Sequence, residues 1–120
     1  MTIHESGIAA NLLEIALQAA EENHLARVTG VSLRIGRLAG VEIGALRFAW
    51  QVLTAGTPAE GAPLVVEEVP IRARCGFCEC EYSPDPDDFT CPLCGEGSVR
   101  LLTGRELDIH SIQGEPYAER

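Results

Sequence analysis

The stretch Cys75-Gly76-Phe77-Cys78, followed after twelve residues by Cys91-Pro92-Leu93-Cys94, decides how this chain is organised. Two Cys-x-x-Cys pairs at this separation are typical of a tetrahedral site in which four thiolates hold one metal ion, most often zinc. Two intervening residues let the chain fold back in a tight knuckle, so both sulfurs reach the ion at about 2.3 Å. Because four sulfurs leave no open position for water, the predicted zinc site is structural rather than catalytic.

Other interpretations of these cysteines stay open. Disulfides or small buried hydrophobic side chains are the first alternative, but no signal peptide precedes the cysteines, which indicates a reducing compartment where disulfides are rare. An iron site of the rubredoxin type is the main chemical rival, because the same knuckles suit either ion. Cys80 is a fifth cysteine, interpreted as a spare, partly exposed thiol or else as a competing ligand. Gly95 can take a positive φ where the second knuckle turns, whereas Glu79 stands at that place in the first.

Length and charge exclude several classes of function. The 120 residues fit one ordinary domain, or a small domain with a metal-stapled insertion. The formal charge is −9, and four thiolates around a dication add −2, giving about −11 for the zinc-loaded chain. Phosphate backbones bind clustered Lys and Arg, so nucleic acid is not an expected partner. No apolar run is long enough to span a bilayer, so we expect a soluble, cytoplasmic protein with no membrane partner.

Hydrophobic periodicity predicts two helices. The first is expected from about Ser6 to Glu22, with Ile15 on its apolar stripe. The second is expected from about Glu42 to Thr54, with Phe48 and Trp50 as its bulky members, interpreted as packing anchors rather than as a binding site.

Alternation and turn residues predict strands at Val28–Ile35, Leu64–Ala73 (interrupted at Pro70), Val99–Leu102 and Arg105–Ile112, and the polar tail from Gln113 is expected to be mobile. The pattern predicts an α+β fold in which two helices pack on a small mixed three-stranded sheet, with a zinc-ribbon-like four-cysteine domain inserted. The expected boundaries are residues 1–73 for the first part of the α+β domain, 74–103 for the zinc domain, and 104–120 for the returning strand and tail.

His4 raises the question of a second metal. A histidine near an amino terminus can offer an imidazole nitrogen, backbone amides and the terminal amine together, and four nitrogens in one plane favour nickel(II) or copper(II) over zinc. The plainer interpretation is a solvent-exposed histidine in a frayed terminus. Glu5 is then an acid at a helix start, where the helix dipole favours it.

The chain resembles the HypA/HybF family of hydrogenase-maturation nickel metallochaperones over nearly its whole length. The knuckles alone are common to many families, but their combination with an early His-Glu is specific. The matching features are His4-Glu5 before the apolar helix from Ile8 to Ala20, Val31-Ser32-Leu33-Arg34-Ile35-Gly36, Leu46-Arg47-Phe48-Ala49, Gly56-Thr57 with Glu60-Gly61-Ala62, the two cysteine knuckles, and Gly104-Arg105-Glu106-Leu107 with Ile109.

The resemblance implies a carrier that delivers nickel to the large subunit of a nickel–iron hydrogenase, working with a nickel-binding GTPase, and some relatives also serve urease. It implies zinc as a structural cofactor and nickel(II) as transient cargo. The implied nickel ligands are the imidazole and backbone nitrogen of His4 and the backbone of Glu5. A carboxylate before the second helix also contributes in some relatives, and Glu42 matches that position, where an acid also serves capping. A homodimer is compatible with the sequence.

One departure from the family lies at the start. In the family the histidine directly follows the initiator methionine, whereas here Thr2 and Ile3 intervene. Either the start is assigned two residues too early, or Met1 is removed, because the small side chain of Thr2 permits it. In the second case the histidine is third, and amine, two amides and imidazole can form one square-planar set.

Functions of three other classes compete with the carrier. A zinc-ribbon nucleic-acid adaptor needs a basic face, which the acidic balance opposes. A rubredoxin-like electron carrier needs iron in the cysteine site. An enzyme needs a nucleophile or base, and the spacing of His24, His110 and the acids indicates neither.

Overall fold

The computed structural model describes residues 3–118, and side chains from Glu5 to Ala118. Two compact units divide the chain. We call Met1–Leu33, Val41–Val66 and Ile109–Arg120 the helical unit, and Arg34–Gly40 with Glu67–Asp108 the cysteine unit. The boundaries expected at 73/74 and 103/104 stay predictions.

The helical unit contains both α-helices, α1 (Ile3–Glu22) and α2 (Ile43–Thr54), which pack against each other. In α1 the buried positions recur at helical spacing, as the apolar stripe requires: Ala9, Leu12, Ala16 and Ala20 are all less than a tenth exposed. Ile15 was expected on this stripe and is instead 49 % exposed, because the buried face is centred on the alanines. Small side chains there let neighbouring backbone approach closely.

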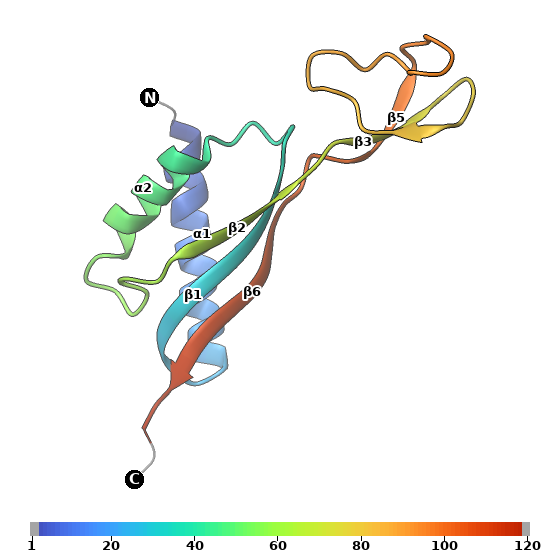
Figure 1. The fold of residues 1–120 in the computed structure, drawn as a ribbon. Helices are drawn as coiled ribbons and strands as arrows, with labels where there is room; N and C mark the ends of the chain where they lie inside the picture. The colour runs from blue at the N-terminus through green and yellow to red at the C-terminus, as the bar shows by residue number, and fades with distance from the viewer. Residues whose placement is uncertain (1–2, 119–120) are drawn as a thin grey trace. The chain divides into compact units, whose positions relative to one another are not determined.

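The first sheet has the strand order β2-β1-β6, formed by β1 (Leu25–Gly36), β2 (Leu64–Val69) and β6 (Leu107–Pro116). β1 and β2 run in the same direction and β6 runs against them, so the sheet is mixed, as predicted (Figure 1). Val31, Leu33 and Ile35 are at most 2 % exposed, which confirms the alternation read in β1. β6 continues to Pro116, past Gln113, so the tail begins later than expected.

Trp50 and the connection after α2 complete the core of the helical unit. The indole Nε1 of Trp50 donates to the carbonyl oxygen of Ala62 at 2.7 Å, and the side chain is 3 % exposed. The backbone amides of Val28 and Val31 donate to the carbonyls of Pro58 and Pro63. The turn-rich connection therefore packs along β1, and Trp50 is the packing anchor that the sequence predicted.

The cysteine unit contains a second, antiparallel sheet of order β4-β3-β5, formed by β3 (Arg72–Cys75), β4 (Glu81–Tyr82) and β5 (Val99–Thr103). Pro70 separates β2 from β3, so the single interrupted strand expected there is two strands in two sheets.

Gly36 and Gly104 lie in close backbone contact within the cysteine unit. A Cβ on Gly36 would stand 2.1 Å from the carbonyl oxygen of Gly104, and Gly104 itself has a φ of 127°. The amides of Gly36 and Leu38 donate to the carbonyls of Glu106 and Gly104 at 2.8 and 2.7 Å. Only glycine permits this approach, which explains why Gly36 ends β1.

Candidate metal centre and the start of the first helix

The first knuckle is built around the sulfur of Cys75. The backbone amides of Phe77 and Cys78 each point at the Cys75 Sγ atom at 3.4 Å, and the amide of Glu79 donates to the Cys75 carbonyl at 3.0 Å. These amides lower the pKa of the Cys75 thiol, led by that of Cys78. A thiolate is the form that binds a metal, so the knuckle prepares this sulfur for ligation.

The second knuckle repeats the first. The amide of Gly95 donates to the Cys91 carbonyl at 3.0 Å, and the amide of Cys94, with that of Leu93, lowers the pKa of the Cys91 thiol to about 6. Gly95 has a φ of 78° and Glu79 a φ of 66°, so both knuckles turn through the left-handed region. Glutamate adopts that conformation less readily than glycine, and the first knuckle is the more strained of the two.

The four cysteine sulfurs converge on one point. All four Sγ atoms lie within 4.8 Å of one another, with 3.5 Å between Cys75 and Cys94 and 3.6 Å between Cys78 and Cys91. A tetrahedron of sulfurs at the zinc–thiolate distance has edges of about 3.8 Å, so the donor set fits a four-thiolate ion. Cys75 and Cys91 are buried and form a small core with Ala73 and Tyr82. The four sulfurs supply a complete tetrahedral donor set, with Cys78 and Cys94 exposed to solvent.

Cys80 lies against this cluster. Its Sγ atom is 3.4 Å from that of Cys91, and the side chain is only partly exposed. The hydrogen bond with Cys91, together with burial, raises the pKa of the Cys80 thiol to about 12. The sequence left two interpretations of Cys80 open, a spare thiol and a competing ligand. The position of its sulfur agrees with both.

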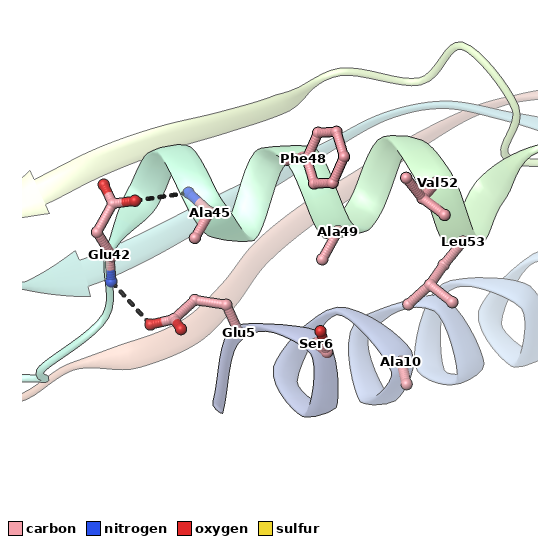
Figure 2. Close-up of a pocket in the computed structure, with 9 residues that line it drawn as sticks. All are labelled: Glu5, Ser6, Ala10, Glu42, Ala45, Phe48, Ala49, Val52 and Leu53. Carbon is pink, nitrogen blue, oxygen red and sulfur yellow. Dashed lines mark hydrogen bonds between the residues drawn. The ribbon is translucent and has the colours of Figure 1, made fainter. Parts of the chain in front are cut away.

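Glu5 links the starts of the two helices. Its carboxylate is 2 % exposed and its Oε2 atom accepts a hydrogen bond of 2.9 Å from the backbone amide of Glu42 (Figure 2). The sequence predicted a role in nickel binding for the backbone of Glu5 and, for its side chain, only that of an acid at a helix start; it did not predict the hydrogen bond with Glu42. A signal was present, because Glu5 stands four residues before Ala9 and so on the buried stripe of α1.

Glu42 is the N-cap of α2. Its Oε1 atom accepts from the amide of Gly44 at 3.1 Å and its Oε2 atom from the amide of Ala45 at 2.8 Å. An acid at this position therefore does cap the helix. A role for the same carboxylate as a nickel ligand stays a prediction, and such a ligand has to exchange at least one cap hydrogen bond for the metal.

An apolar groove of about 580 Å³ runs beside these two acids, between α1 and α2. Ala10 and Ser6 of α1 and Phe48, Val52 and Leu53 of α2 line it (Figure 2). Phe48 is 68 % exposed, so its expected role as a packing anchor was wrong. The packed face of α2 turns through Leu46, Ala49 and Trp50 instead, which leaves Phe48 on the outer edge.

Part of the predicted nickel-ligand set lies at one end of this groove, next to Glu5 and Glu42. The backbone of His4 belongs to the first turn of α1, and its side chain lies outside the described residues. The structure thus brings together Glu5 and Glu42, and gives no position for the imidazole. Among residues 3–118, no helix combines the length and apolar character needed to cross a membrane.

Known proteins match this chain along nearly its whole length. The hydrogenase maturation factor HypA of Roseiflexus sp. (strain RS-1) is 44 % identical over 114 residues, covering 94 % of this chain and 93 % of the relative. That of Chloroflexus aggregans is 41 % identical over 112 residues, covering 92 % and 98 %. The solution structure of the Ni metallochaperone HypA from Helicobacter pylori superposes with a TM-score of 0.65 at 17 % identity, covering 94 % and 98 % of the two chains, and so shares the fold.

A family profile covers almost the same span. The profile described as "Hydrogenase/urease nickel incorporation, metallochaperone, hypA" matches residues 3–114. The family match has that extent, and the two relatives named above exceed 40 % identity. The two helices on a mixed sheet and the converged four-cysteine cluster agree with the same family. The chain belongs to the HypA family of nickel-incorporation metallochaperones, and it is a metal carrier rather than an enzyme.

Proposed function

We propose that this chain carries nickel(II) bound near His4 and hands it to the large subunit of a nickel–iron hydrogenase, with a nickel-binding GTPase as partner in the cytoplasm. The observation that carries the proposal is the family match across residues 3–114, which includes His4-Glu5 and all four clustered cysteines. The description of the family names both hydrogenase and urease. We assign hydrogenase as the target because the relatives from Roseiflexus and Chloroflexus, at 44 % and 41 % identity, are hydrogenase maturation factors.

Zinc is the ion that we assign to Cys75, Cys78, Cys91 and Cys94. When bound, zinc supplies a permanent cross-link between the two knuckles and no open coordination position. Cys75 is also paired with Val99 across the sheet, so the first knuckle begins where β3 meets β5. The small core around the knuckles supports the assignment, since the roughly thirty residues of the predicted zinc domain, 74–103, cannot bury enough apolar surface to fold on their own.

The nickel site that we propose uses the imidazole and backbone nitrogen of His4 and the backbone of Glu5. The buried Glu5 carboxylate fixes the first turn of α1 against the amide of Glu42, so it positions these backbone atoms. Few ligands near an exposed groove favour release, which a delivery protein needs. Binding requires the neutral imidazole, so nickel affinity falls as the pH is lowered and the ring is protonated.

The apolar groove beside Glu5 supports contact with a protein partner. Phe48 and Val52 are 68 % and 58 % exposed, and neighbouring exposed apolar side chains of this size mark interaction surfaces more often than chance. A partner seated there would lie next to the proposed nickel ligands. We assign this surface to the maturation partners, the GTPase or the hydrogenase subunit.

The test is nickel binding by the wild type and His4→Ala, with zinc content measured alongside. We expect the variant to lose nickel binding by at least about tenfold and to keep one zinc per chain. His110→Ala is the matched control, because His110 is an exposed histidine on β6, and it should bind nickel like the wild type. Equal nickel binding by His4→Ala and the wild type would overturn the nickel assignment. A wild type without zinc would overturn the zinc assignment independently.

A further inference from the structure

The two knuckles have equivalent backbone hydrogen bonds, and these bonds determine the position of Cys80. The amide of Cys75 donates to the carbonyl of Cys80 at 2.9 Å, and the amide of Cys91 donates to the carbonyl of Glu96 at 2.8 Å. The fifth residue after the first cysteine is thus held beside each knuckle. In the second knuckle that residue is Glu96, and in the first it is a thiol.

The Cys80 thiol lies against the four-cysteine cluster. Its Sγ atom is 3.4 Å from that of Cys91, and two pairs within the four-cysteine cluster, Cys75–Cys94 and Cys78–Cys91, are 3.5 and 3.6 Å apart. It also contacts the Cys78 thiol and packs on the core that contains Tyr82. The fifth sulfur is therefore as near to one ligand sulfur as the ligands are to each other, and it lies on the edge between Cys78 and Cys91.

A tetrahedral ion accepts only four of the five sulfurs at a time. A cysteine sulfur moves by roughly 3 Å when its side chain changes from one staggered rotamer to another, which is close to the distance that separates Cys80 from the Cys91 position. Cys75 and Cys94 form the opposite edge, at 3.5 Å. A change of rotamer at Cys80 can therefore replace Cys91 without dismantling the rest of the site.

We propose that Cys80 is a reserve ligand, which exchanges with Cys91 in the coordination of the structural ion. In the exchange one metal–sulfur bond breaks and one forms, and the proton lost by the Cys80 thiol is balanced by the proton that the released Cys91 sulfur takes up. The consequence is a site that keeps its metal when Cys91 is lost. The inference rests on the zinc assignment of the proposed function and not on nickel delivery.

The first experiment uses cobalt(II) as the probe, because its charge-transfer absorbance reports the number of bound thiolates. The full-length variants are Cys91→Ser and Cys80→Ser/Cys91→Ser. We expect Cys91→Ser to keep the four-thiolate absorbance and the double variant to lose about a quarter of it, because one of four sulfur bonds is gone. Equal spectra for the two variants would overturn the proposal.

The matched control removes a ligand on the opposite edge. Cys94→Ser should lose the same quarter of the absorbance whether or not Cys80 is present, because the Cys94 sulfur pairs with Cys75 on the edge opposite Cys78 and Cys91. Rescue of Cys94→Ser by Cys80 to the same degree as Cys91→Ser would show a site of general plasticity, and the specific exchange with Cys91 would be wrong.

A second measurement avoids any ligand variant, in case Cys91→Ser does not fold. The zinc-loaded wild type is alkylated with N-ethylmaleimide to one label per chain, and native mass spectrometry selects chains that still hold zinc. We expect the label to divide between Cys80 and Cys91, and the labelling at Cys91 to disappear in Cys80→Ser. A label found on Cys80 alone would refute the exchange. A wild type that holds no zinc would instead refute the zinc assignment.

Discussion

The carboxylate of Glu5 accepts a hydrogen bond of 2.9 Å from the backbone amide of Glu42, thirty-seven residues further along the chain. Glu42 in turn caps α2 with both of its carboxylate oxygens. The start of α1 is therefore attached to the start of α2 through one buried acid and one exposed acid. The nickel ligands that we propose at His4 and Glu5 would depend on this connection for their position.

Replacing Glu5 by Ala should destabilise the helical unit by about 1–3 kcal/mol, because it leaves the Glu42 amide without this acceptor in a partly buried place. The measurement is urea unfolding followed by the fluorescence of Trp50, the only tryptophan. Glu14→Ala is the control, since Glu14 is exposed on the same helix, and it should change stability little. Nickel affinity should fall with Glu5→Ala and stay unchanged with Glu14→Ala, whereas zinc content should be unchanged in both.

Two variants of Glu42 separate capping from metal binding. Glu42→Ala should cost about 0.5–2 kcal/mol, because α2 loses its N-cap, whereas Glu42→Ser should retain most of the stability, because serine caps helices well. If the carboxylate is also a nickel ligand, both variants should bind nickel more weakly by a similar factor. Nickel binding that follows stability, normal in Glu42→Ser and reduced in Glu42→Ala, would restrict Glu42 to capping.

Glu79→Gly should stabilise the cysteine unit by about 1 kcal/mol, because Glu79 is exposed and holds a φ of 66° that glycine adopts without strain. Gly95→Ala, at the equivalent place with a φ of 78° and open space around the new Cβ, should destabilise by a similar amount. Resistance of the bound zinc to a chelator at neutral pH is the measurement. The same direction of change in both variants would show that left-handed strain does not limit the knuckles.

Gly36→Ala should be among the most damaging substitutions in the chain. Its Cβ would stand 2.1 Å from the carbonyl oxygen of Gly104, so the backbone of one strand has to move and the hydrogen bonds of Gly36 and Leu38 are strained. We expect a loss of more than about 3 kcal/mol in the free energy of unfolding, or no folded protein. Gly40→Ala, where no atom lies within 4 Å of the added Cβ but φ is 75°, should cost only about 1 kcal/mol.

Removal of zinc by a chelator should unfold the cysteine unit and leave the helical unit folded. The sheet β4-β3-β5 and its knuckles depend on the metal because the core around Cys75 and Cys91 is small, whereas Trp50 is buried and hydrogen-bonded to Ala62 in the other unit. Amide hydrogen exchange should accelerate in β3 and β5 and not in α1, with the emission of Trp50 unchanged. Acid should act in the same direction, because protons compete with zinc for the thiolates. Loss of protection in both units together would refute the independence.

The predictable part of this protein is local in the chain. The four-cysteine cluster was predictable from the spacing of Cys75, Cys78, Cys91 and Cys94, because two-residue gaps impose the knuckle whatever surrounds it. Alternation determined β1, and the apolar periodicity determined both helices, because these periods follow from backbone geometry. The His4-Glu5 pair, together with the knuckles, was enough to indicate the family.

Tertiary structure alone decided which groups from distant parts of the chain meet. Periodicity placed Phe48 on an apolar face but could not say that this part of the face stays uncovered, because that depends on where α1 packs. The buried Glu5 carboxylate, the contact of Gly36 with Gly104, and the 3.4 Å between Cys80 and Cys91 each join residues well apart in sequence. A local sequence pattern cannot predict such contacts, since burial and contact are set by the packing of the whole unit rather than by neighbouring residues.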